Sequence, residues 1–239
     1  MNNLNSGFYN DLDTNFKEAL EMSKRDFLHD ELINMLINGN IPQKQIAALR
    51  LDCLNSKQEA DILIGNLTGC DGKIREAVAL TINNLLNQNK DYALYFYHKP
   101  EIFANATIDI NGNICRLVID SVSILKNNKG FTTTYLKYIT KFISEAFDEL
   151  NNFNFRDKKY TINKQLFKLY WCLETLKLFV NIIDINVLYS IIERASKERE
   201  YTIREKTAQL IKISNNKIFD SIKKELMNDD NYYVKNIFK

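Results

Sequence analysis

One short segment recurs along the chain, and its spacing constrains the fold more than any other feature. The segment DGKIREAV at residues 71–78 has a partner, NGNICRLV, at residues 111–118. Further copies lie at residues 201–208 and 231–237, a looser one surrounds Ile162, and a degenerate one occupies residues 42–49. A repeat of about 40 residues indicates supersecondary units that stack, because one such unit cannot bury its own apolar face.

Each copy opens an amphipathic helical pattern. The anchors Ile74, Ile114, Ile162, Ile203 and Val234 are separated by 40, 48, 41 and 31 residues. Apolar side chains follow these anchors at spacings that place them on one face of an α-helix. We name these the B helices. Preceding amphipathic segments, the A helices, are expected near residues 57–67, 99–107, 132–150, 186–198 and 216–227, with one or two more near residues 12–38.

Two Gly-containing turns separate A helices from B helices. They are Asp71-Gly72 and Asn111-Gly112, which occupy equivalent positions in adjacent repeats. Glycine accepts the left-handed conformation that ends many helices, so we expect that conformation here. The Asp or Asn beside it is expected to cap the following B helix.

Composition supports an all-helical reading. Only 7 of the 239 residues are Gly and 2 are Pro, whereas 45% are hydrophobic. Sandwiches, barrels and Gly-rich nucleotide-binding folds need many tight turns, so this composition argues against them. The expected fold class is therefore all-α, with short connections between helices.

At these residues the chain resembles the HEAT repeat family. That family has an Asp in the turn between two antiparallel helices, then an aliphatic-Arg pair that opens helix B; Asp71, Ile74, Arg75, Ala77 and Val78 match this pattern. The resemblance implies a right-handed α-α superhelix, a HEAT-like solenoid of about five to six helix pairs. It also implies Asp–Arg bonds between neighbouring repeats.

The middle of the chain departs from the family pattern. Cys115 and Asn163 stand where Arg is expected, so the Asp–Arg ladder should be interrupted there. The interval of 48 residues points to an insertion, for which residues 151–157 are the best candidate. We expect a single repeat domain over residues 1–239, with residues 1–28 a capping helix or a partly disordered lead-in.

The repeat register predicts a binding surface. In HEAT stacks the B helices line the concave side, and positions +2, +6, +9 and +13 from each anchor should face outward. Trp171, the only Trp, falls on this row beside Lys164 and Lys168, and an aromatic flanked by cations is a plausible anchor for a peptide or nucleic acid. Alternatively the register slips by one residue and Trp171 packs in the core. The partner-binding candidates are Arg116, Lys164, Lys168, Trp171 and Lys212.

Two groups of aromatic residues could likewise pack in the core or form an exposed contact surface. Tyr92, Tyr95, Phe96 and Tyr97 with Phe103 have helical spacing, which favours packing over an exposed patch. Near the end of the chain, Tyr232, Tyr233 and Phe238 are expected to cover the last repeat rather than bind a partner.

Catalytic and metal-binding motifs are missing from the sequence. The Cys residues form no CxxC pair and are expected to be reduced thiols, and the only two His, His29 and His98, are far apart. A Cys–His dyad would need distant segments to fold together, so we expect no enzyme, no cofactor and no metal site. The N-terminus lacks a signal-peptide pattern and no stretch reads as a membrane span, which favours a cytoplasmic protein.

The charge is near neutral overall but uneven. Residues 1–125 carry 11 Lys/Arg and 16 Asp/Glu, whereas residues 126–239 carry 21 and 14. This split is typical either of chance variation in surface charge along a chain or of a protein whose two ends orient a charged partner.

The first functional hypothesis is a noncatalytic scaffold or adaptor that binds a protein or peptide on its B helices. The alternatives are a nucleic-acid-binding protein similar in design to the HEAT-like alkylpurine DNA glycosylases, and a lyase-like or chaperone-like relative of the phycobilisome HEAT proteins.

Overall fold

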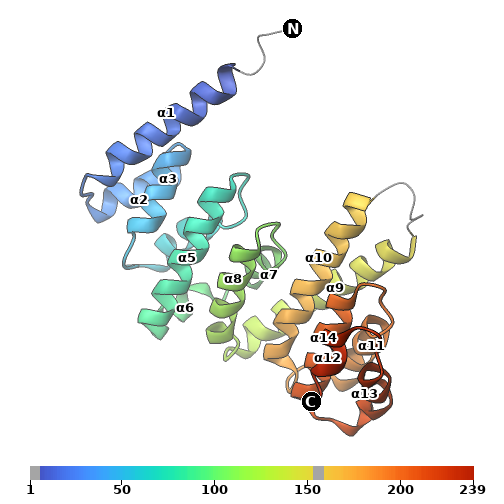
Figure 1. Ribbon diagram of the computed structural model, residues 1–239. Coiled ribbons are helices and arrows are strands. Elements are labelled where there is room, and N and C mark those ends of the chain that lie inside the picture. Colours follow the sequence, from blue (N-terminus) through green and yellow to red (C-terminus); the bar gives the residue numbers. More distant parts are fainter. Residues whose placement is uncertain (1–5, 153–158) are drawn as a thin grey trace. The chain divides into compact units, whose positions relative to one another are not determined.

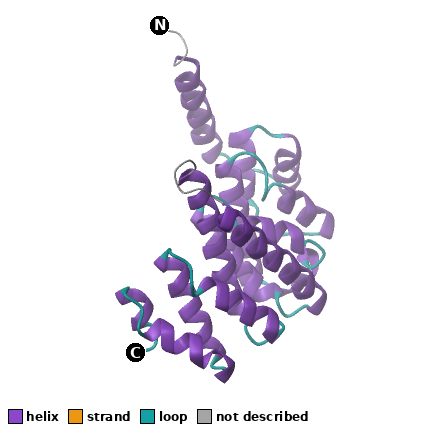
Figure 2. Cartoon of the chain, turned by 90° about the vertical axis from the view of Figure 1, so that its right-hand side faces the viewer, coloured by secondary structure: helices purple, strands orange, loops and turns teal. Residues whose placement is uncertain are grey.

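The computed structural model describes residues 6–152 and 159–239, and the regular secondary structure in this part of the chain is helical. It contains 14 α-helices and three short 3-10 helices, with no strand in these ranges (Figure 2). The expected all-α fold class is confirmed. Across the described residues, no helix combines the length and apolar character that crossing a membrane requires.

The chain divides into two compact units. Unit 1 comprises Met1–Ala106 and Asn111–Thr132, and unit 2 comprises Thr107–Ile110 and Thr133–Lys239. Each unit is described below by itself. A single continuous repeat array over residues 1–239 stays a prediction.

Unit 1 packs its helices in two rows (Figure 1). The B helices α3, α5 and α8 contact one another in sequence, and the helices α2, α4 and α6 do the same. The elements are α1 (Ser6–Ser23), α2 (His29–Asn38), α3 (Ile41–Arg50), α4 (Lys57–Gly65), α5 (Gly72–Gln88), α6 (Ala93–Phe96), most of α7 (Pro100–Thr107) and α8 (Gly112–Leu125).

Unit 2 repeats the same local design. The B helices α10, α12 and α14 contact one another in order, while α11 and α13 each pack against a B helix. The elements are α9 (Lys129–Asn152), which enters this unit at Thr133, then α10 (Lys159–Leu176), α11 (Ile185–Ala195), α12 (Tyr201–Ser214), α13 (Asp220–Met227) and α14 (Tyr232–Asn236). All expected A and B helices are present within a few residues of their predicted bounds. Most of the insertion expected at residues 151–157 lies outside the described residues.

Four B helices begin with the same side-chain cap. Asp71, Asn111 and Asn231 each accept the backbone N–H two residues ahead, at 2.8, 2.9 and 2.9 Å. Glu200 does so at 3.5 Å. These caps satisfy otherwise unpaired N–H groups at the starts of α5, α8, α14 and α12; the sequence predicted them for Asp71 and Asn111.

The role expected for the turn glycines is wrong. Gly72 and Gly112 are the first residues of α5 and α8, and no glycine in the described ranges has a positive φ. The cap residue makes the turn in extended conformation, so the following glycine needs only helical angles. The left-handed residue among those described is Asn215 (φ 47°), at the end of α12.

Two arginines secure these turns in the same way. Arg75 Nη1 donates to the carbonyls of Gly69 and Cys70, six and five residues back, at 2.9 and 3.1 Å. Arg204 Nη1 makes the same two bonds, to Glu198 and Arg199, both at 2.8 Å.

Arg204 also reaches the next turn. Its Nε and Nη2 donate to the two carboxylate oxygens of Asp229, at 2.6 and 3.0 Å. This bidentate pair joins the start of α12 to the turn before α14, which is the kind of Asp–Arg bond between repeats that the sequence predicted. The hydrogen bond from Arg204 holds the pKa of Asp229 below its usual value.

We predict that Asp229→Asn lowers the free energy of unfolding by about 2 kcal/mol at pH 7, because a hydrogen bond to a charged partner is lost from a side chain that is 8% exposed. Since the folded-state pKa is lowered, the stabilisation is complete above the unfolded pKa of about 3.9 and is lost as the pH falls through the lowered value.

Urea titrations at several pH values measure both effects. The exposed neighbour Asp230 supplies the control, since Asp230→Asn should change stability by less than about 0.5 kcal/mol. Equal effects of the two substitutions at pH 7 would contradict the role of the pair.

Candidate functional site

On three B helices no residue of the predicted outward row is buried. Leu80 on α5, Asp120 on α8 and Lys212 on α12 are all exposed, while the anchors Ile114 and Ile203 are fully buried. On these helices the cap fixes where the helix starts, so the spacing from the anchor correctly locates the outward face.

On α10 the predicted register is wrong by one residue. Trp171 is 5% exposed and Thr175 is fully buried, with its hydroxyl 3.0 Å from that of Tyr135. The alternative interpretation, in which Trp171 packs in the core, is confirmed. The anchor Ile162 has Lys159 three residues before it, where the other repeats have Asp, Asn or Glu, so the sequence offers no cap residue from which to count the register. With the register moved by one, Asn163 is exposed and Phe167, Tyr170 and Glu174 are half-buried, so these four residues share one outward face; Lys164 beside them is also exposed.

Trp171 supports this outward row from beneath. Its ring meets those of Tyr170 and Phe167 edge to face, with centroids 5.2 and 6.0 Å apart. Lys206 of α12 lies over the Tyr170 ring, 4.6 Å from its centroid. A cation–aromatic contact is therefore made one residue earlier, by Tyr170, and with Lys206 rather than with Lys164 or Lys168, the cations that the sequence predicted.

A partly buried charge cluster continues the row. Glu174 pairs with Lys177 at 2.6 Å and with Lys206 at 2.7 Å, and the three side chains are 24%, 22% and 11% exposed. Lys177 also donates to Gln209 of α12 at 3.2 Å. Burial opposes the charged forms, but the two lysines outweigh it at Glu174 and hold the pKa of that carboxyl below its usual value. Burial likewise opposes charge on Lys206, yet its bonds to Glu174 and Tyr170 raise its pKa.

These side chains form one continuous surface between neighbouring B helices. Two half-buried aromatics lie at one end, and two lysines surround Glu174 at the other. Glu205 of α12 accepts from Gln209 at 3.2 Å, so lysines and glutamates balance here. We call this surface the α10–α12 face. Its residues are Phe167, Tyr170, Glu174, Lys177, Lys206 and Gln209.

The sequence-predicted site residues do not gather on this face. Lys164 is exposed on α10, and Lys168 pairs with Glu145 of α9 at 3.2 Å and lies over the Phe142 ring. Lys212 donates to the carbonyl of Ile237 at 2.6 Å, which ties α12 to the end of the chain.

Arg116 belongs to unit 1, where it is exposed on α8 and donates to Asn113 at 3.0 Å. The equivalent surface of unit 1 has a different chemistry, because Glu76 of α5 there accepts from Asn111 and Asn113 at 3.1 and 3.0 Å. Phe167, Tyr170 and Lys206 were not predicted as site residues. A register shifted by one would have found the first two.

The two aromatic groups that the sequence placed in the core or over the last repeat are only partly buried. Phe96 and Phe103 are fully buried and meet edge to face, so this run is confirmed as core at those two positions. Tyr232 and Tyr233 are 59% and 60% exposed, but the Tyr233 ring stacks on Tyr201 of α12. The last pair therefore covers the start of α12 while keeping much of its surface exposed.

A second cluster brings together residues that are far apart in sequence. His29 Nδ1 lies 3.7 Å from Cys53 Sγ, and His29 Nε2 lies 3.0 Å from Glu59 Oε2. The three residues come from the start of α2, the loop after α3 and α4. Burial, and then the hydrogen bond and charge of Asp52, raise the pKa of the Cys53 thiol.

The sequence offered no signal for this cluster, because separations of 24 and 30 residues follow no local motif. Among the residues that the structure describes, no group of three or more His, Cys, Asp or Glu side chains is arranged to hold a metal ion.

Comparisons with known proteins leave the site to be interpreted from its own residues. No protein-family model matches the chain, and no curated protein does. Among solved structures it is similar to the crystal structure of an engineered protein. The two are 9% identical, the match covers 87% of this chain and 92% of the other, and the TM-score is 0.46.

We predict that truncating the two adjacent aromatics of α10 lowers the free energy of unfolding by very different amounts. Trp171→Ala should lower the free energy of unfolding by about 3–5 kcal/mol, because it leaves a cavity in the core. Tyr170→Ala should cost about 1 kcal/mol, since that ring is half-exposed and loses mainly its contacts with Lys206 and Trp171. Chemical denaturation of both variants tests the register, and a larger loss for Tyr170→Ala would contradict it.

Proposed function

We propose that the chain is a noncatalytic binding module of the HEAT-like class, a right-handed superhelix of helix pairs that holds a protein or peptide segment on its B helices. The ordered rows of B helices in each unit support this proposal. Such rows create long, shallow surfaces suited to extended partners.

The binding surface in this proposal is the α10–α12 face. Its chemistry carries the proposal: half-buried aromatics supply apolar contact area beside the partly exposed cation Lys177. Aromatic residues beside cations are frequent anchors in protein interfaces. The expected partner is a protein segment with acidic and apolar side chains, which the basic excess of residues 126–239 would attract.

The nucleic-acid alternative has less support. A glycosylase-like cleft would use an exposed Trp, whereas Trp171 is 5% exposed. The net charge of +2 also gives little general attraction for phosphates. What favours this alternative is the excess of lysines in the second half of the chain.

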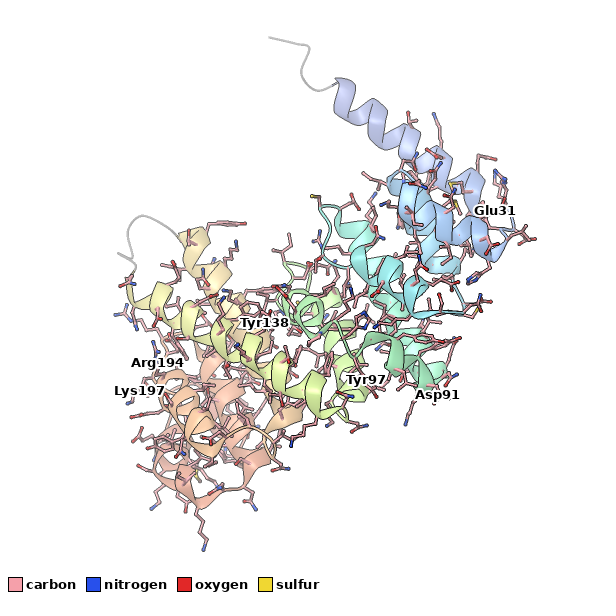
Figure 3. The ribbon with its side chains drawn as sticks, turned by 180° about the vertical axis from the view of Figure 1, so that it is seen from behind. Glu31, Asp91, Tyr97, Tyr138, Arg194 and Lys197 are labelled. Carbon is pink, nitrogen blue, oxygen red and sulfur yellow. The ribbon has the colours of Figure 1, made fainter. Side chains whose placement is uncertain are left out.

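A capture experiment with matched variants tests the binding surface. Tyr170→Ala combined with Lys177→Gln removes one aromatic and one cation from the α10–α12 face. The control makes the same two changes on α9, at Tyr138 (labelled in Figure 3) and the exposed Lys141. We expect at least one protein to be captured by the wild type and the control but lost from the face variant.

Each captured protein is then titrated with the purified variants by calorimetry. A loss of affinity of about tenfold or more in the face variant alone supports the proposal, since removal of an interface anchor costs more than about 1 kcal/mol. Equal binding by the face variant and the control would contradict it.

Measuring the affinity for duplex and single-stranded DNA at several salt concentrations distinguishes the nucleic-acid alternative from the proposed function. We expect a Kd weaker than about 100 μM at moderate salt, below the range of nonspecific DNA binders. A tighter, steeply salt-dependent Kd that weakens in the face variant would favour the nucleic-acid function instead.

A further inference from the structure

The contacts of Cys53, His29 and Glu59 have the order of a nucleophile, a base and an orienting carboxylate. The thiol lies 3.7 Å from one ring nitrogen of His29, and the carboxylate lies 3.0 Å from the other. Active sites with a covalent nucleophile place their groups in this order, whatever the fold. The cluster lies in unit 1 and is independent of the α10–α12 face.

The acceptor Glu59 determines the direction of these hydrogen bonds. A carboxylate only accepts, so the Nε2–H of His29 donates to Glu59 and Nδ1 is left with a free lone pair. Nδ1 can then accept the S–H of Cys53, for which the Asp52 carboxylate is a competing acceptor. The ring is therefore held in the tautomer that can take a proton from the thiol.

The thiol needs such a base in order to react. Burial raises the pKa of the thiol, and the neighbouring carboxylates Asp52 and Glu59 raise it further, which favours the neutral thiol. A neutral thiol is a poor nucleophile unless a base removes its proton as the new bond forms. His29 is placed to do this.

Backbone contacts hold the three groups in place. The loop that carries Cys53 is tied to α4, because the N–H of Asn55 donates to Glu59 Oε2 at 2.8 Å. The N–H of Leu54 donates to the Tyr92 hydroxyl at 3.3 Å. At the start of α2, the N–H of Leu28 donates to Glu31 at 2.8 Å, next to His29 (Glu31 is labelled in Figure 3). Glu59 is thus a positioning residue for His29, and the N–H of Asn55 in turn holds the Glu59 carboxylate in place.

We propose that Cys53 is an acyl-accepting nucleophile that takes an acyl group from a small activated ester or thioester, with His29 as its general base. Cys53 Sγ bonds to the carbonyl carbon while the thiol proton passes to His29 Nδ1. The bond from that carbon to the leaving oxygen or sulfur then breaks, and His29 returns the proton to the leaving group. The products are S-acyl Cys53 and a free alcohol or thiol.

The test uses p-nitrophenyl acetate as the activated ester, with the acetylated cysteine identified by mass spectrometry of tryptic peptides. The other cysteines are internal controls: Cys70 is exposed, and Cys115 and Cys172 are buried. We expect Cys53 to be acetylated faster than the more exposed Cys70 at pH 7. Cys115 and Cys172 should stay unmodified as long as the protein is folded.

The variant His29→Ala isolates the base. We expect it to slow acetylation of Cys53 by about 100-fold, within the range of general-base catalysis, and to leave the rate at Cys70 unchanged. Added imidazole should restore part of the rate at Cys53, which no purely structural role of His29 explains. Acetylation of Cys53 at an equal rate in the wild type and in His29→Ala would overturn the proposal.

A double-mutant cycle tests whether Glu59 acts through His29. Glu59→Gln should slow acetylation of Cys53 in the wild-type background but have no effect in His29→Ala. An equal loss in both backgrounds would show that Glu59 only maintains the local fold and would overturn its positioning role. Far-UV circular dichroism and unmodified Cys115 verify that each variant is folded.

Discussion

The start of each B helix is the constraint on which the rest of this structure depends. A capping side chain accepts the backbone N–H two residues ahead, and this fixes which residue is the first of the helix. Once the start is fixed, a period of 3.6 residues determines which side chains enter the core and which face outward. Because neighbouring B helices pack side by side, a cap at the start of one helix decides which of its side chains enter the surface that it shares with the next. Arg204 extends the constraint by joining its own turn to Asp229 of the next one.

This constraint explains how much could be predicted from the sequence. Asp71 and Asn111 mark the starts of α5 and α8, so helix bounds and outward faces there follow from the repeat pattern alone. The first turn of α10 carries no such residue, and aligning it by its apolar residues placed Trp171 one position wrong. The error is small in sequence but rotates the helix by about 100°, enough to exchange a core ring for a surface ring.

Other features could not be read from any local pattern. Lys206 is a lysine that the structure buries to 9% exposure, and it is stable there because Glu174 and Tyr170 come from a different helix. Cys53, His29 and Glu59 meet only after α2, α3 and α4 have packed, so their contacts depend on tertiary structure that sequence spacing does not encode. Both clusters contain charged or reactive groups that are partly removed from water, where their interactions are stronger than at an open surface.

The central claim is that α10 turns Tyr170 outward, with Trp171 beneath it, and thereby creates the α10–α12 face. Hydroxyl-radical footprinting of the unmodified protein tests this most directly, because tandem mass spectrometry resolves oxidation at adjacent residues. Each rate is divided by the rate of the same residue in urea, which removes the difference in intrinsic reactivity between Tyr and Trp. The account predicts strong protection of Trp171 and weak protection of Tyr170 and Phe167. Stronger protection of Tyr170 than of Trp171 would contradict it.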